Sequence, residues 1–227
     1  MMKRTDFLVI AGAILIFAPF FIFEEVYGGF EYFTKNYALI AAFVKFAVLA
    51  TFGESIALRI REGVYNRKGF GLLPRAIVWG FLGITIQAAF VIFSSGTPSF
   101  LKSLGAETSG TDFNAAGILT AFAISTAMNL IYAPIMMTLH KITDTHIIRN
   151  KGNISALTKR IDFADILKNI DWQTHWHFVL KKTIPFFWIP AHTFTFLLPT
   201  EFRVLFAAVL GIVLGLILAF AAGQKIR

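Results

Sequence analysis

Near its C-terminus the sequence has a long apolar run without a charged residue, from Val204 to Ala222. As an α-helix this run would be ~29 Å long, which is about the thickness of a bilayer core. A shorter run, from Ile184 to Leu198, precedes it across a polar turn. The shorter run reaches a spanning length if its helix begins at Lys181 and Lys182, whose charged ends can extend to the membrane surface. The two runs together predict a helical hairpin in a membrane.

The composition of the chain is also that of a membrane protein. Of its 227 residues, 56% are hydrophobic and 15% are charged, which is too little charge to cover a soluble domain. Long apolar runs recur along the chain, and such runs predict membrane-spanning helices. We therefore expect an all-α, polytopic transmembrane helix bundle, formed as a single domain by residues 1–227.

Six apolar spans are expected. They are residues 7–23, 37–58, 76–93, 115–139, 181–198 and 204–222. The first span precedes no small-residue cleavage site, so a retained anchor helix is favoured over a cleaved signal peptide. The acidic and aromatic residues 24–36 and the Ser-, Gly- and Thr-rich residues 94–114 are expected to form loops.

The long polar segment from His140 to Thr183 contains a helical pattern. Between Ile154 and Ile170, apolar residues recur every three or four positions, and charged residues occupy the opposite face. This pattern predicts one amphipathic helix that lies on the membrane surface or against the bundle.

The basic residues are distributed unevenly between the two expected sides of the membrane. With a cytoplasmic amino terminus, the inside segments hold 17 of the 21 Lys and Arg residues, and the outside segments hold 3. Cytoplasmic loops of membrane proteins carry such an excess. We therefore expect both termini to be cytoplasmic, in a bacterial cytoplasmic membrane or, for a eukaryotic source, in an organelle membrane.

The last third of the chain carries a pattern of spaced residues. Trp188 and Pro190 are followed by Phe196 and Pro199, and Arg203 comes four residues after that proline. This pattern resembles the signature of the Mpv-17 and 22-kDa peroxisomal membrane protein family, over approximately residues 133–222. Further positions similar to the family pattern are Gly53, Glu54, Pro134 and Asp144.

The resemblance implies an integral membrane protein, usually with four spans. Eukaryotic members of that family sit in mitochondrial inner and peroxisomal membranes, and some members are proposed to form channels for small solutes. The first span of this chain would then be an addition. His192 stands where the family has Gln, and Thr195 stands where it has Asn.

Small residues recur every four positions in the last span, at Ala207, Gly211, Gly215 and Ala219. Such a face lets two helices approach closely within a membrane. Packing within the chain is favoured, and the interface of a homo-oligomer is the alternative.

Two charged residues have expected structural roles. Glu54 lies near the cytoplasmic end of its span, where Arg59 or Arg75 could neutralise it. Arg203 is expected to cap the hairpin turn or to contact lipid phosphate, because it follows the turn directly.

Four spans each place one polar side chain at a similar depth. Counted from the expected membrane entries, Lys45, Gln87, Asn129 and His192 lie at depths of ~12, ~17, ~21 and ~17 Å. Polar groups at such depths normally face the bundle interior or water. We expect them to line a hydrated cavity that Lys45 biases toward anionic solutes. A cluster of interhelical hydrogen bonds is the alternative.

The sequence contains no Gly-x-Ser-x-Gly, no His-Glu-x-x-His and no intramembrane carboxylate pair. We expect no enzyme activity, no metal and no cofactor. Basic cytoplasmic loops account for the net charge of +8, so no nucleic-acid partner is expected. The leading hypothesis is a small channel or solute-permeability pore, with membrane lipids and small solutes as partners. A non-conducting, structural membrane-organising protein is the alternative.

Overall fold

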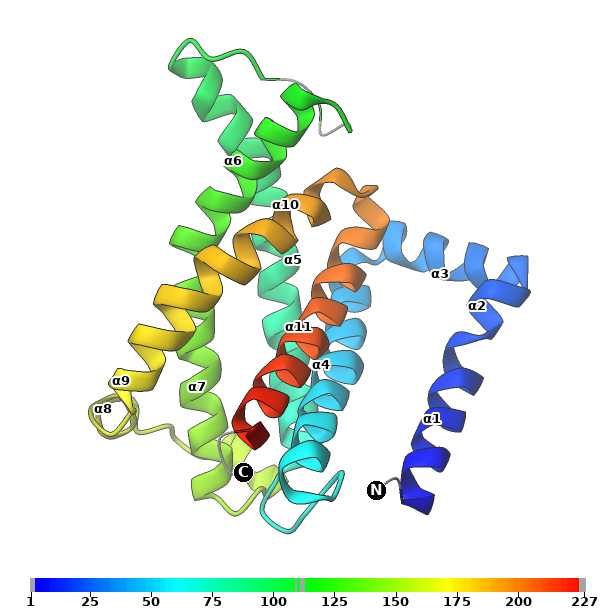
Figure 1. The fold of residues 1–227 in the computed structure, drawn as a ribbon, viewed down its shortest axis with the longest axis vertical. Helices are drawn as coiled ribbons and strands as arrows, with labels where there is room; N and C mark the ends of the chain where they lie inside the picture. The colour runs from blue at the N-terminus through cyan, green and yellow to red at the C-terminus, as the bar shows by residue number, and fades with distance from the viewer. Residues whose placement is uncertain (1–2, 109, 111–112, 225–227) are drawn as a thin grey trace.

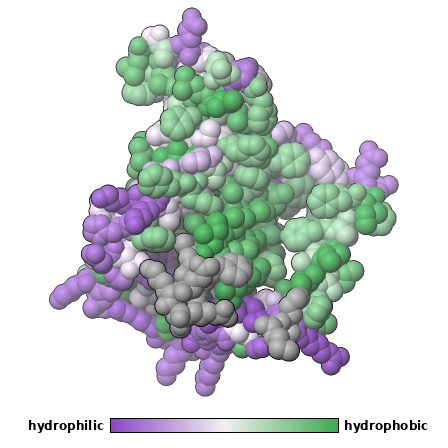
Figure 2. Space-filling model, in the orientation of Figure 1, coloured by the Kyte–Doolittle hydropathy of each residue, from purple (hydrophilic) through white to green (hydrophobic). Residues whose placement is uncertain are grey.

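The computed structural model describes residues 3–108, 110 and 113–224, and it describes side chains only as far as residue 217. Within these residues every regular element is helical (Figure 1). Figure 2 shows hydrophilic residues gathered at the end of the molecule that holds the start of α1 and the loop after α4, with a broad hydrophobic surface above them. The protein is a helical membrane protein.

The chain begins with an arm of three helices that stands apart from the bundle (Figure 1). They are α1 (Arg4–Phe17), α2 (Pro19–Ile22) and α3 (Glu24–Asn36). Asp6 of α1 forms an ion pair with Arg59, at 2.6 Å, and this pair ties the arm to the bundle.

The loop expected at residues 24–36 is wrong, because this segment forms α3. This segment is a helix that joins the arm to the start of α4, with acidic residues in its first turn and Lys35 in its last (Figure 1).

Helices α4 (Ala38–Glu62) and α5 (Leu72–Ser103) pack against each other and form one wall of the bundle. Helix α5 continues ten residues beyond the expected span end at residue 93, so the loop expected at residues 94–114 is wrong over its first half. The hydroxyl groups of Ser94, Ser99 and Ser103 donate to backbone carbonyls three or four residues earlier. These bonds allow the serines to stay within a helix rather than open a loop.

Two glycines allow α4 and α5 to approach closely. A Cβ atom added at Gly83 would lie 2.7 Å from the carbonyl oxygen of Ala42, and one at Gly80 would lie 2.4 Å from the ring of Phe43. The ring of Phe43 can rotate away from an added methyl group, but the backbone of Ala42 cannot. Gly83 therefore tolerates a side chain less well than Gly80, although its distance is longer.

We expect Gly83→Ala to lower the free energy of unfolding by about 1–3 kcal/mol, because the added methyl group forces α4 and α5 apart. Gly96→Ala is the matched control on the same helix, since a Cβ there meets nothing within 4 Å. The control should be neutral or stabilising by up to about 1 kcal/mol. Denaturant unfolding in detergent measures both, and equal stability of the two variants would contradict the close contact.

Helices α6 (Ala115–Ile131) and α7 (Ala133–Arg149) form a broken span, with a bend of 43° between them. The bend lies at Pro134 in the first turn of α7, where a proline lacks only an N–H that a helix start leaves free. Helix α7 thus continues well into the segment that the sequence analysis treats as polar.

The single amphipathic helix expected between Ile154 and Ile170 is wrong. That stretch forms two short helices, the 3-10 helix η1 (Ile154–Thr158) and the six-residue α8 (Phe163–Lys168). Helix α9 (Trp172–Thr174) follows them. The side chains of Asp162 and Asp171 accept hydrogen bonds from the backbone N–H groups of Asp165 and Thr174. Each aspartate therefore caps a new short helix, and the helix that begins after Asp162 divides the expected one. The apolar positions pack on α7 instead, in a small cluster that contains Ile142, Ile166 and Ile170.

The chain ends with a π-helix, η2 (His175–Trp188), followed by α10 (Ile189–Leu197) and α11 (Thr200–Gln224). The predicted cap of the turn between α10 and α11 is confirmed. Arg203 Nε donates to the carbonyl of Leu198, and its Nη2 donates to the carbonyl of Phe196, each at 2.9 Å. These two bonds satisfy carbonyls that the end of α10 leaves without helical partners.

Four helical stretches of the described residues are long and apolar enough to cross a membrane: Arg4–Ile22, Ala38–Glu62, Leu72–Ser103 and Thr200–Ile217. The bent pair of α6 and α7 makes a fifth if it counts as one span. The expected span at residues 181–198 is not among them. It is divided between η2 and α10, and its apolar run is the shortest of the six.

Candidate functional site

A cavity of about 340 Å³ lies between α4, α5, the α6–α7 pair, η2, α10 and α11. Its wall is mainly apolar and includes Phe46, Phe90, Met128 and Met136. Pockets that hold small molecules have this character, with a few polar groups that fix the orientation of the ligand. The polar groups of this wall fall into an inner pair and an outer cluster.

The inner pair is Asn129 of α6 and His192 of α10, whose side chains are 0% and 8% exposed. Asn129 Nδ2 donates to the carbonyl of Ser125 at 2.9 Å and lies 3.0 Å from His192 Nδ1. Ser125 Oγ donates to the carbonyl of Ile189 at 2.8 Å. These bonds join α6 to α10 at positions more than sixty residues apart in the sequence. The structure thus brings together two of the four polar residues that the sequence analysis placed at one depth.

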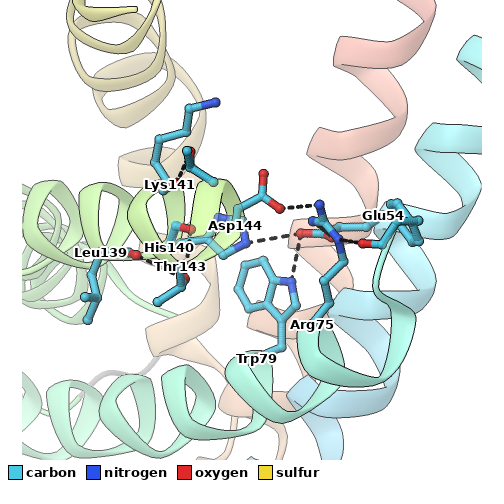
Figure 3. Close-up of polar contacts among 10 residues, drawn as sticks. Glu54, Arg75, Trp79, Leu139, His140, Lys141, Thr143 and Asp144 are labelled. Atoms are coloured by element: carbon cyan, nitrogen blue, oxygen red, sulfur yellow. Dashed lines mark hydrogen bonds and ion pairs between the residues drawn. The ribbon is translucent and has the colours of Figure 1, made fainter. Parts of the chain in front are cut away.

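The outer cluster consists of Glu54, Arg75, Trp79, His140 and Asp144, which point toward one another from α4, α5 and α7 (Figure 3). Arg75 Nη1 lies 2.5 Å from Glu54 Oε2, and its Nη2 forms a second ion pair with Asp144. Trp79 Nε1 donates to Glu54 Oε1 at 2.9 Å, and His140 Nε2 lies 3.1 Å from the same oxygen. The guanidinium group of Arg75 therefore pairs with two carboxylates, and these contacts join α4, α5 and α7.

The outer cluster confirms one of the two partners expected for Glu54. Arg75 is that partner, whereas Arg59 pairs with Asp6 of the arm. Arg75 is almost fully buried, and its Nε also donates to the carbonyl of Phe70. Glu54, Trp79 and His140 belong at the same time to the wall of the cavity, so the cluster forms part of that wall.

Lys141 and His175 lie on the cavity wall beside the outer cluster. His175 Nε2 is 3.1 Å from Thr138 Oγ1. Burial, and to a smaller degree the charge of Lys141, lower the pKa of His175 below its usual value. The neutral form of His175 is therefore favoured.

Lys45 and Gln87 do not reach the cavity. Lys45 Nζ donates to Thr34 Oγ1 at 2.9 Å and lies 4.5 Å above the ring of Phe30, so it faces α3 and not the interior path. Gln87 is half-buried on α5 and is not part of the cavity wall. The expectation of four polar side chains around one hydrated cavity is corrected to two. The depth count gave a position along each helix, but it carried no information on the direction of the side chain.

We expect Lys45→Met to loosen α3 and to leave the cavity intact. Lys45 holds α3 by a charged hydrogen bond and a cation–π contact, so amide hydrogen exchange across Glu24–Asn36 should rise about fivefold to tenfold. Val48→Met, at an exposed position of the same helix, is the control and should leave exchange unchanged. Unchanged exchange in the Lys45 variant would show that its contacts with α3 are not formed in the membrane protein.

The row of small residues on α11 is divided between packing within the chain, which was the favoured expectation, and the cavity wall. A Cβ atom added at Gly211 meets nothing within 4 Å, and one at Gly215 meets only the carbonyl oxygen of Gly53, at 4.0 Å. Both glycines face the cavity. The close contact between α4 and α11 is at Gly53, where an added Cβ would lie 3.1 Å from the Cα of Ile212. Ala207 is buried, and the side chain of Ala219 lies outside the described residues.

The remaining positions of the family-like pattern shape the chain around the cavity. Pro190 is in the first turn of α10, and Pro199 directly precedes α11. Phe196 is fully buried against Phe90, with ring centroids 5.0 Å apart. Trp188 lies on the cavity wall, and its ring centroid is 5.1 Å from that of His192.

Trp79 and His140 of the outer cluster were not predicted, and Asp144 was named only as a position of the family-like pattern. Trp79, His140 and Asp144 are separated by up to 65 residues, and nothing in their spacing indicates that they meet. The signal in the sequence was Glu54 near the end of an apolar span, which indicated that an arginine such as Arg75 would pair with it. In the described part of the chain, no group of three His, Cys, Asp or Glu residues could hold a metal ion.

Comparisons with protein-family models, with curated proteins and with solved structures find no match for this chain. The resemblance to the Mpv-17 and 22-kDa peroxisomal membrane protein family therefore stays a prediction.

Proposed function

We propose that the protein is a solute-permeability protein whose internal cavity holds a small solute within the membrane. The observation that carries the proposal is the cavity of about 340 Å³, which lies among the membrane helices and has polar groups at its inner and outer parts.

The outer cluster suits the role of a gate in this proposal. Glu54, Trp79 and His140 line the cavity and also join α4, α5 and α7. A solute that passes this cluster must separate these helices or displace one of the contacts of Glu54. Because Arg75 is shared between Glu54 and Asp144, one carboxylate can keep its partner while the other exchanges it.

The test is release of trapped solutes from liposomes that contain the purified protein. A set of neutral and charged solutes of increasing size is trapped, and release is compared with that from protein-free liposomes. We expect selective release of solutes small enough for the cavity. A folded protein that releases none of them would overturn the proposal.

The second candidate is a non-conducting protein that organises membrane or lipid. The observation that favours it is Lys45, a buried charge that is satisfied by Thr34 and Phe30 away from any path. Structural contacts of this kind require no solute. Folded protein without solute release in the liposome test is the outcome that this candidate expects.

We further propose that both termini and the segment from residue 140 to residue 183 face the cytoplasm. The excess of basic residues in these parts of the chain supports this orientation. η2 and α10 together run back to the turn before α11, so the start of α1, the end of α7 and the end of α11 lie toward the same end of the molecule (Figure 1). In this cysteine-free chain, single cysteines at Ser103 and Ser155 report the two sides of the membrane. An impermeant thiol reagent on intact cells should label the first and spare the second. Equal labelling would contradict the orientation.

A further inference from the structure

The segment η2 is an unusually long π-helix. Helices of this type occur mostly as single turns within α-helices, often at functional sites, whereas η2 extends over 14 residues. At its end the N–H of Ile189 donates to the carbonyl of Ile184, five residues earlier, as this helix type requires. The helices α9 and α10 adjoin η2 without a break (Figure 1). η2 is therefore the part of one continuous helix that has a wider turn.

The burial of side chains in η2 follows the wider turn. Buried and half-buried positions recur at residues 175, 179–180, 183–184 and 187–189, and exposed positions lie between them, at residues 176–178, 181–182 and 185–186. This repeat is longer than the 3.6 residues of an α-helix. It matches the about 4.4 residues per turn of a helix with i→i+5 hydrogen bonds. The packing thus agrees with the hydrogen bonding.

The wider turn determines which side chains of η2 line the cavity. They are His175, Val179, Thr183 and Trp188. With about 82° per residue, these four side chains lie within about 65° of one another around the helix axis. With the about 100° per residue of an α-helix, Trp188 would be about 140° away from both His175 and Thr183. Only the π-helix places all four residues on one face.

An α-helical η2 would present other residues to the cavity. The hydrogen bond from Ser125 to the carbonyl of Ile189 holds the start of α10 on α6, so the end of η2 is fixed. With Trp188 kept on the wall, α-helical spacing places Lys181 within about 20° of it. The same spacing turns Thr183 about 140° away from the wall. A cationic side chain would thus replace a hydroxyl group on the cavity wall.

Pro185 is the residue of η2 that opposes an α-helix. A proline within an α-helix lacks its hydrogen bond, and its ring collides with the carbonyl four residues earlier, which here is that of Lys181. Membrane helices accommodate such a proline by local π adjustments. The face of η2 away from the cavity includes Trp176 and Phe178, which are 56% and 40% exposed. This face can turn without displacing another helix of the described chain.

We propose that η2 is a switch in the cavity wall, which converts between the observed π-helix and an α-helix. The conversion removes Thr183 from the wall and brings Lys181 into it, so the cavity gains a positive charge in addition to that of Lys141. The α-helical form therefore favours an anionic solute. The inference rests on the proposed function only in taking the cavity as the place that a solute occupies.

Single cysteines in this cysteine-free chain report the conformation of η2. With the purified protein in detergent, a water-soluble thiol reagent should label Lys181→Cys about tenfold faster than Thr183→Cys, because position 181 is exposed and Thr183 is only 7% exposed. Adding Pro185→Ala should reverse this order, since position 181 then faces the cavity. Phe186→Cys is the reference for the labelling rate, because Phe186 is 81% exposed and lies away from the cavity in both forms.

The matched control for Pro185→Ala is Pro98→Ala, which removes a proline from inside α5. It should leave the order of labelling in η2 unchanged. A small anion tests the switch without a change at Pro185. Benzoate should speed the labelling of Thr183→Cys about threefold, because it stabilises the form with Lys181 in the cavity, whereas neutral benzyl alcohol should not. Adding Lys181→Gln should abolish the effect of benzoate.

Equal labelling of positions 181 and 183 without Pro185→Ala would overturn the assignment of the wall residues to a π-helix. An unchanged order in Pro185→Ala, or an equal response to benzoate and benzyl alcohol, would overturn the switch. The labelling needs no transport. A reversed order without solute release from liposomes therefore overturns the proposed function alone, and solute release without a reversed order overturns the inference alone.

Discussion

Replacement of Arg75 by leucine is expected to lower the free energy of unfolding by about 3–5 kcal/mol, the largest loss expected of any single change in this protein. Arg75 pairs with Glu54 and Asp144, whose side chains are 20% and 19% exposed. Without the guanidinium group, two carboxylates remain close together with little access to water, and removing one partner of a buried pair leaves the other uncompensated. Denaturant unfolding in detergent measures the loss.

The exposed pair of Arg149 and Asp165 supplies a matched control, because it also joins an arginine to an aspartate. Arg149→Leu should cost less than about 1 kcal/mol, as is usual for ion pairs at a surface. Combining Arg75→Leu with Glu54→Gln and Asp144→Asn should recover a large part of the stability, since no buried charge then lacks a partner. Equal costs for Arg75→Leu and Arg149→Leu would show that the outer cluster does not stabilise the fold.

Part of the fold and of the outer cluster could be predicted from the sequence. The apolar runs predicted the class of protein, because a bilayer requires long stretches without charge. The position of Glu54 near a helix end predicted an arginine partner, and the spacing of Arg203 after the turn predicted its cap. Each of these inferences concerns residues that are close in the sequence, or a charged group that requires a partner of opposite charge.

The other members of the site could not be inferred in this way. His140 and Asp144 reach Glu54 and Arg75 only because α7 extends through a segment that composition marks as polar. Lys45 contacts α3 because residues 24–36, expected as a loop, fold as a helix that joins the arm to the start of α4. A count along one helix gives depth, but the rotation of that helix and the choice of its neighbours depend on packing throughout the bundle.

Replacement of Gly211 by phenylalanine is expected to reduce solute release from liposomes by tenfold or more, while the free energy of unfolding changes by less than ~1 kcal/mol. The row of small residues on α11 predicted instead a helix contact at this glycine, which a larger side chain would disrupt. The structure reverses the expectation because a Cβ at Gly211 meets nothing within 4 Å and the residue faces the cavity. The added ring therefore enters empty space instead of displacing a neighbouring helix, so the cost of overpacking is not incurred.

The control for this variant is Val213→Phe, on the same helix at a position that is 39% exposed and does not line the cavity. It adds an aromatic ring to the lipid-facing surface and should leave release at the wild-type rate. The two variants thus differ in whether the ring occupies the cavity. If Gly211→Phe is folded and releases solute as fast as Val213→Phe, solutes do not pass through this cavity. If Gly211→Phe instead unfolds, α11 packs against another helix at this glycine, as its small-residue pattern first indicated.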